Sequence, residues 1–196
     1  MEAFEQFVAV ALEAERFVVS PAVKFRVRRQ TKKTAYTEMQ THGYEVDLVA
    51  ARADRLVLAT VKSFFGSRGV VAEHVANKSS KHGKLYMLLN DEEIRDGVIR
   101  SACEEYGYEA SQVQLRLYVG KFAAPKKGTH EAAIREWCGT QHAGAGRIEV
   151  FGVEQVVEAV RESAALKQYR DNPVLVTMKV LQAAGLLTLG SENRAA

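Results

Sequence analysis

The sequence predicts an α/β protein with a mixed central β-sheet flanked by helices and a helical C-terminal extension. Two apolar, β-branched-rich runs, residues 43–51 and 56–63, are separated by a short polar turn and are typical of a β-hairpin. A strand, a helix and a strand follow one another between residues 113 and 151, which is typical of a right-handed parallel crossover. Beyond residue 152 the apolar residues recur at helical spacing.

Length and composition indicate an ordinary globular protein. The chain has 196 residues, of which 47% are hydrophobic and 26% are charged. We expect residues 1–152 to form the α/β core and residues 153–196 to form the helical extension. No apolar run approaches the roughly 18 residues of a membrane span. Glu2 and Glu5 stand where a signal peptide carries basic residues, so we expect a cytoplasmic protein with no membrane partner.

The N-terminal third combines a helix with a basic strand. Phe4, Val8 and Leu12 recur at helical spacing, and residues 17–29 alternate as a strand that Pro21 interrupts. Six basic residues and no acid lie between residues 21 and 37: Lys24, Arg26, Arg28, Arg29, Lys32 and Lys33. They form either the solvated outer face of a half-exposed strand or a ribbon that tracks phosphates. Residues 30–42 are polar and predict a loop.

The remaining elements follow from caps and periodicity. Asn90 followed by three acids predicts the start of a helix that Gly107 ends. Asn172 and Pro173 predict the start of the last helix, which ends at Gly185. The other expected elements are helices over residues 70–76, 129–140 and 153–164, and strands over 113–122 and 147–151.

The hairpin carries acids and a lysine within core-like sequence. Strand alternation places Glu45 and Asp47 on one face of the first strand, and Thr60 and Lys62 together on the second. Buried charges are costly unless they are paired or bind a metal. Asp47 and Lys62 therefore predict either a structural ion pair or a metal-binding site.

This pattern resembles the PD-(D/E)xK nuclease superfamily, whose fold is restriction-endonuclease-like. Members carry an Asp at the end of one strand and an (Asp/Glu)-x-Lys on the next. Asp47 and Lys62 match the first and last elements, whereas Thr60 stands at the position of the middle acid. The resemblance implies Mg²⁺- or Mn²⁺-dependent hydrolysis of DNA, with RNA as the alternative nucleic acid, by a fold whose members often form homodimers.

Three explanations for the missing acid remain open. Glu73 could replace it from the helix after the lysine strand. Glu5 or Glu45 could complete the metal site instead, and Glu5 has the spacing of a first-helix Glu in the superfamily, seven residues before Leu12. In the third explanation the site has lapsed, and the protein binds nucleic acid or a partner protein without cleaving.

Other enzyme classes fit less well. The sequence contains no Gly-rich phosphate loop and no Gly-x-Ser-x-Gly elbow. Cys138 and His142 have no second pair at zinc-finger spacing, and Cys103 and Cys138 both fall in helical patterns. The function that the resemblance implies is therefore retained as the expectation: a metal-dependent nuclease acting on DNA in restriction, repair or mobile-element biology.

Overall fold

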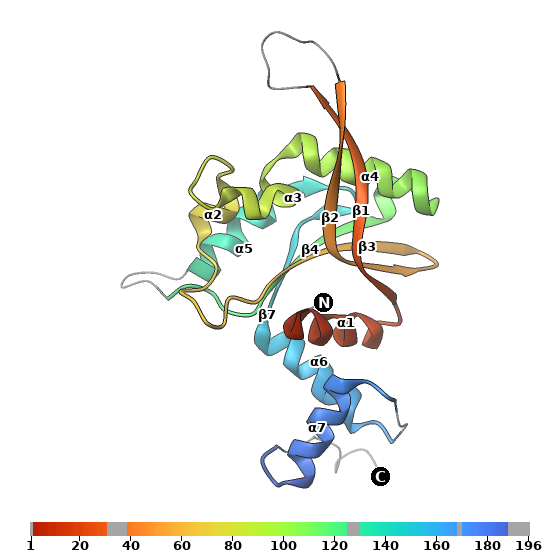
Figure 1. The fold of residues 1–196 in the computed structure, drawn as a ribbon, viewed down its shortest axis with the longest axis vertical. Helices are drawn as coiled ribbons and strands as arrows, with labels where there is room; N and C mark the ends of the chain where they lie inside the picture. Colours follow the sequence, from red (N-terminus) through yellow and green to blue (C-terminus); the bar gives the residue numbers. More distant parts are fainter. Residues whose placement is uncertain (1, 31–38, 125–129, 168–169, 188–196) are drawn as a thin grey trace.

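A five-stranded mixed sheet forms the centre of the molecule (Figure 1). The computed structural model describes residues 2–30, 39–124, 130–167 and 170–187. The strands lie in the order β1-β2-β3-β4-β7. Their bounds are β1 (Val18–Gln30), β2 (Met39–Arg52), β3 (Arg55–Lys62), β4 (Val113–Val119) and β7 (Glu149–Gly152). A separate two-stranded ribbon pairs β5 (His142–Ala143) with β6 (Gly146–Arg147).

The sheet joins an antiparallel half to a parallel half. β1 pairs with β2, and β2 with β3, in antiparallel register, and Arg52 opposes Arg55 across a two-residue turn. β3 pairs with β4, and β4 with β7, in parallel register. The helix α5 (His130–Thr140) lies between β4 and β7 in the chain. The mixed α/β fold and the parallel crossover are therefore as the sequence predicts.

Helices cover both faces of the sheet (Figure 1). One face packs Leu56 and Leu58 of β3 against α4 (Glu92–Tyr106) and its neighbours. These neighbours are α2 (Ala72–Ala76), the 3₁₀ turn η1 (Gly83–Tyr86) and α3 (Met87–Asn90); a second 3₁₀ turn, η2 (Ala110–Gln112), precedes β4. The other face packs Val57 and Ala59 against α1 (Ala3–Ala14) and the start of α6 (Val153–Ala165). This opposite placement of neighbouring residues is the period-two signature of a buried strand.

The helical extension packs on the core through α1. Val10 of α1 shares a buried cluster with Val160 of α6 and with Val174 and Leu175 of α7 (Pro173–Ala183). The Asn172 side chain caps α7 by accepting from the backbone N–H of Val174 at 3.0 Å. Within the described ranges, no helix has both the length and the apolar character required to cross a bilayer.

Several element boundaries differ from the sequence expectation. β1 runs through Pro21 without interruption, because β1 is an edge strand and tolerates a residue that has no N–H to donate. Residues 39–42, expected in a loop, belong to β2. Asp91, rather than Asn90, caps α4, and Gly107 ends it in the left-handed conformation at φ 76°. β4 ends at Val119, three residues earlier than expected.

The long hairpin of β1 and β2 changes face at the rung of Ala22 and Asp47. On β2, Leu48 and Ala50 face the α1 layer, whereas Val46 belongs to the cluster on the α4 side. On β1, Val19 packs on the α1 side and Phe25 on the α4 side. Ala22 has φ +53°, a conformation that is uncommon for residues other than glycine. The strict alternation assumed from sequence is therefore broken beside Asp47.

Candidate active site

Asp47 and Lys62 meet at the end of the β2–β3 ladder. Lys62 Nζ lies 3.2 Å from Asp47 Oδ2, and the two side chains are 17% and 23% exposed. The same oxygen accepts from Thr60 Oγ1 at 3.1 Å and from the backbone N–H of Val61 at 2.6 Å. Three donors therefore fix one carboxylate oxygen. Between described residues no hydrogen bond uses the other oxygen, Oδ1.

The local geometry follows from how the strands diverge. Regular backbone pairing of β2 with β3 ends at Leu48 and Ala59. One rung further, the Asp47 carboxylate takes the place of a backbone carbonyl as the acceptor for Val61. β3 meanwhile stays paired with β4 as far as Lys62 and Val119, and Gly120 N donates to the Lys62 carbonyl at 2.9 Å. Lys62 is thus held by β4 on one side, while β2 diverges from β3 on the other side.

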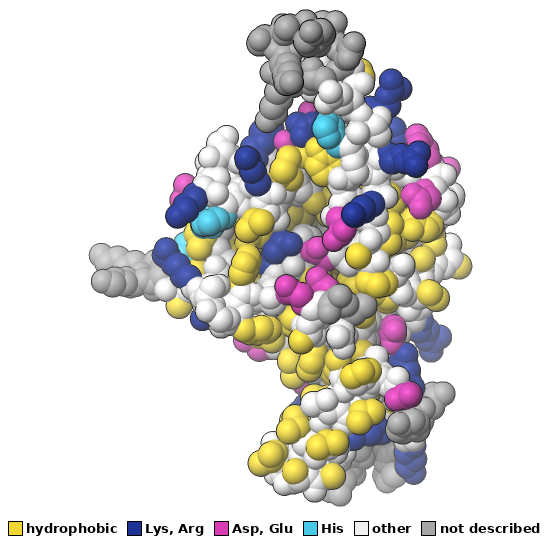
Figure 2. Space-filling view, in the orientation of Figure 1, with side chains coloured by type: hydrophobic (Ala, Val, Ile, Leu, Met, Phe, Trp, Pro, Cys, Tyr) yellow, Lys and Arg dark blue, Asp and Glu magenta, His cyan; other side chains and the backbone are white. Residues whose placement is uncertain are grey.

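The N-terminus of α1 lies beside this strand end. Ser63 Oγ donates to Glu2 Oε2 at 3.1 Å, and the backbone N–H of Glu2 donates to Glu5 Oε2 at 2.8 Å. Figure 2 shows acidic side chains gathered near the middle of this face, close to where Figure 1 places the N-terminus of α1. Sequence reasoning selected Glu5 and missed Glu2. The signal for Glu2 was its i, i+3 spacing from Glu5, which is that of a reciprocal cap.

The structure does not bring the expected metal ligands together. Glu45 pairs with Lys24 of β1 at 3.7 Å on the exposed hairpin. Because the strand changes face at Asp47, the side chains of Glu45 and Asp47 lie on different faces. Glu73 is exposed on α2. Glu5 is engaged by the backbone of Glu2. In the part of the chain that the structure describes, no three His, Cys, Asp or Glu side chains form a group able to hold a metal.

The residues present still fit a magnesium ion that takes a single carboxylate from the protein. Mg²⁺ is commonly held by one or two carboxylates, with water and substrate phosphate oxygens completing the shell. Asp47 offers one carboxylate whose Oδ2 is fixed by three donors and whose Oδ1 is used by none of them. Asp47 is therefore the residue that would hold the ion.

The basic residues of β1 divide into two groups. Arg26 and Arg28 are exposed on the face of β1 that turns away from α4, and Lys24 shares that face but pairs with Glu45. Arg29 instead points toward α4, where it contacts Glu93 at 2.9 Å and Asp91 at 3.5 Å. Its hydrogen bond to Tyr44 raises the pKa of the Arg29 guanidinium. Arg29 thus links β1 to α4 and does not lie on an open surface. Lys32 and Lys33 lie outside the described residues.

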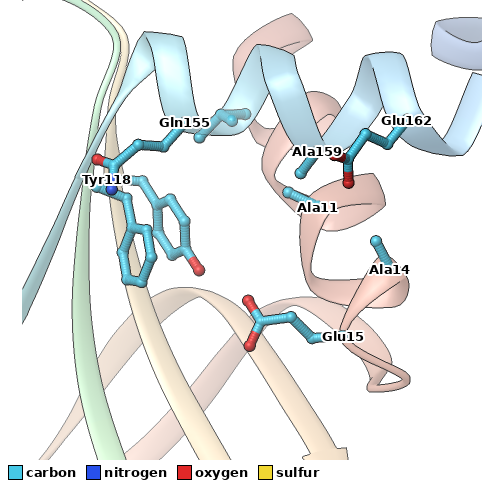
Figure 3. A pocket seen from close by; sticks show the side chains of 9 residues that line it. Ala11, Ala14, Glu15, Tyr118, Gln155, Ala159 and Glu162 are labelled. Carbon is cyan, nitrogen blue, oxygen red and sulfur yellow. The ribbon is translucent and has the colours of Figure 1, made fainter. Parts of the chain in front are cut away.

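A cavity of about 260 Å³ lies on the face of the sheet that α1 covers, between α1 and α6 (Figure 3). Tyr118 and Glu15 point into it, with Glu162 at its α6 side. Behind it, the buried Arg116 guanidinium contacts Glu15 at 2.8 Å and Glu149 at 3.2 Å. Burial raises the pKa of Tyr118 to about 12, so its phenol stays protonated. Glu15 is already paired with Arg116, which makes this arrangement part of the packing of α1.

Comparison with known proteins leaves the family open. No family model matches the chain, and neither does any curated protein. Among solved structures, the crystal structure of protein of unknown function AF1548 is similar, with 16% identity and a TM-score of 0.36. The similarity covers 93% of this chain and 77% of that chain, and a TM-score this low supports no inference about function.

Proposed function

We propose that this protein is a metal-dependent phosphodiesterase of the PD-(D/E)xK type that cleaves DNA. The observation that supports the proposal is the contact of Lys62 with Asp47 at 3.2 Å, where β2 and β3 diverge. An acid and a lysine on adjacent strands of a mixed sheet are the two elements by which the sequence resembles that superfamily. The exposed Arg26 and Arg28 on β1 add positive charge suited to phosphate contacts.

Each residue has a definite role in this proposal. A bound Mg²⁺ would stabilise charge on the phosphate oxygens and lower the pKa of a water molecule. Asp47 would hold the ion, and the donors Thr60 and Val61 fix the orientation of its carboxylate. Lys62 carries a positive charge next to Asp47 and would stabilise the negative charge that develops on the phosphate during cleavage.

A second candidate function has its own supporting observation. Thr60 occupies the position of the middle acid, and its hydroxyl donates to Asp47 rather than adding a charge. Together with the lack of a three-carboxylate group among the described residues, this favours a lapsed site that binds nucleic acid without cutting it.

One experiment separates the two functions. The full chain is incubated with labelled duplex, single-stranded and branched DNA, with Mg²⁺ or Mn²⁺ and in parallel with EDTA. Cleavage that requires metal and is lost in Asp47→Asn supports the nuclease. Binding of DNA without cleavage in either metal supports the lapsed site. Absence of both binding and cleavage rejects both functions.

A further inference from the structure

An exposed aromatic side chain stands three residues after Lys62. Phe65 is 53% exposed, although burial of a phenylalanine ring is normally favourable. Three residues span at most about 11 Å, so the backbone of Phe65 lies within that distance of the backbone of Lys62.

The ring of Phe65 is held in a fixed position. Its partner is Phe4 of α1, whose ring meets it edge to face with centroids 5.4 Å apart. Gly120 closes the space behind it, because a Cβ at that position would come 2.7 Å from the Phe65 ring and 2.6 Å from the Ser63 carbonyl oxygen. A side chain at position 120 would therefore displace the ring.

The backbone of the loop explains why Phe65 faces outward. Phe64 has φ +46°, an unfavourable conformation for a bulky residue, and it packs partly against the core. The chain thus turns Phe64 inward and Phe65 outward. Lys121 Nζ donates to the carbonyl of Ser67 at 2.7 Å and ties the loop to the end of β4.

Basic side chains lie on the segments on either side of this ring. Arg68 and Lys121 are both exposed on the segments that flank Phe65, and Lys121 also donates to the Ser67 carbonyl. Lys62 precedes the ring and is paired with Asp47, and Glu2 contacts Ser63 two residues before it. An open aromatic face among basic side chains is the arrangement by which proteins hold single-stranded nucleic acid, because every base can stack on the ring while cations contact the phosphates.

We infer that Phe65 stacks on an unpaired base and that the substrate is single-stranded DNA or the single-stranded end of a duplex. This inference rests on the proposed function, since it assigns the substrate class of the same site. Phe4 and Gly120 act as positioning residues for the ring.

The test measures binding in EDTA, so it does not depend on cleavage. The intact chain is titrated with a single-stranded oligonucleotide containing a fluorescent adenine analogue, and with the same sequence as a blunt duplex. Phe65→Leu should weaken single-strand binding roughly 5- to 150-fold and abolish quenching of the base analogue. Duplex binding should change less than about twofold, and Phe65→Trp should retain single-strand affinity.

Tyr106→Leu is the matched control. Tyr106 is also a partly exposed aromatic, 40% accessible, and meets Phe25 edge to face at 6.2 Å, but it lies at the end of α4. Thermal unfolding checks that each variant is folded. The tryptophan introduced in Phe65→Trp gives a second readout, because its fluorescence should change when DNA binds. The signal of the wild type is subtracted, and the variant keeps an aromatic ring at this position.

The outcomes distinguish this inference from the proposed function. Single-strand affinity unchanged in Phe65→Leu, an equal loss for duplex and single strand, or Phe65→Trp fluorescence insensitive to bound DNA would each overturn the inference. Metal-dependent cleavage could still occur in those cases. Conversely, the wild type could fail to cleave DNA while Phe65→Leu still weakens single-strand binding. That result would support the stacking role of Phe65 and reject the nuclease proposal.

Discussion

Lys62 Nζ contacts Asp47 Oδ2 at 3.2 Å, although the two residues are 15 positions apart and no regular backbone pairing joins β2 to β3 at that level. The contact depends on side chains that replace the backbone ladder where the strands separate. Both side chains keep part of their surface exposed, so the pair is in contact with solvent.

In the proposed nuclease, Asp47→Asn and Lys62→Met should each reduce metal-dependent DNA cleavage by at least about 100-fold, because Asp47 would hold the metal ion and Lys62 would stabilise charge on the phosphate. Cleavage is measured as initial rate in Mg²⁺. Lys24→Met is the control, since Lys24 pairs with Glu45 on an exposed part of the hairpin. Turnover that survives both site substitutions would place the active site elsewhere.

Replacing Arg26 and Arg28 together by alanine should weaken binding to all duplex sequences similarly and flatten the salt dependence. Each lost phosphate contact lowers the slope of log K against log salt by about 0.9. The double replacement of the exposed Arg100 and Arg147 removes the same charge from other elements and should leave the slope nearer the wild-type value. Equal slopes for wild type and the Arg26, Arg28 variant would remove this strand from the interface.

Arg29→Met should affect stability rather than DNA binding. Arg29 links β1 to the start of α4, and the side chain of its partner Asp91 is only 5% exposed. Among the residues that the structure describes, the substitution leaves that carboxylate with Lys78 at 3.4 Å as its remaining ion partner. We expect a loss of about 1–3 kcal/mol in the free energy of unfolding, measured by urea titration. A salt slope lower than that of the wild type would instead place Arg29 at the DNA surface.

Arg116→Met should destabilise the protein by about 1–3 kcal/mol, because it removes charge-assisted hydrogen bonds to Glu15 and the ion pair with Glu149, whose side chains are 40% and 43% exposed. Glu149→Gln removes only one of the two ion pairs and should have a smaller effect. Both free energies come from urea unfolding. A larger loss in Glu149→Gln would show that Arg116 is not the centre of this network.

Tyr86→Phe should make the protein less sensitive to high pH. Burial raises the pKa of Tyr86 to about 12, above its ordinary value of 10.0. The folded state therefore favours the protonated phenol, and the associated stability is complete below pH 10 and declines as pH rises toward 12. The slope of unfolding free energy against pH in this window should be shallower in Tyr86→Phe. An unchanged slope would assign the alkaline loss to other groups, such as Tyr118.

The fold was predictable where local signals agree with packing. Gly107 and Asn172 mark helix ends through backbone and capping geometry that depends on neighbouring residues alone. Pro21 misled the strand prediction because the position of β1 at the sheet edge is a property of the whole topology. Leu85 and its neighbours form short 3₁₀ and α turns whose pattern is too brief to show a period.

The site was predictable only in part. The hairpin brings Asp47 and Lys62 to neighbouring strands, which sequence alternation reveals. Their direct contact does not follow from pairing, because the regular register ends at Leu48 and Ala59. The placement of Glu45 does not follow, because alternation is reversed at Ala22, where the backbone has φ +53°. Arg29 was grouped with Arg26 and Arg28 by charge, yet its position on the other face of the strand gives it Asp91 and Glu93 as partners. Glu2 was missed because its contact with Ser63 joins residues 61 positions apart.

The change of face at Ala22 and Asp47 divides the hairpin into two parts that an engineer can treat separately. Between this rung and the distal ends of the strands, adding or removing two residues on each strand preserves which side chains meet α4 and which carry positive charge outward. A single-residue change on both strands would exchange these roles and turn Arg26 and Arg28 into the apolar layer. Homologues with longer or shorter hairpins should therefore differ in each strand by even numbers of residues.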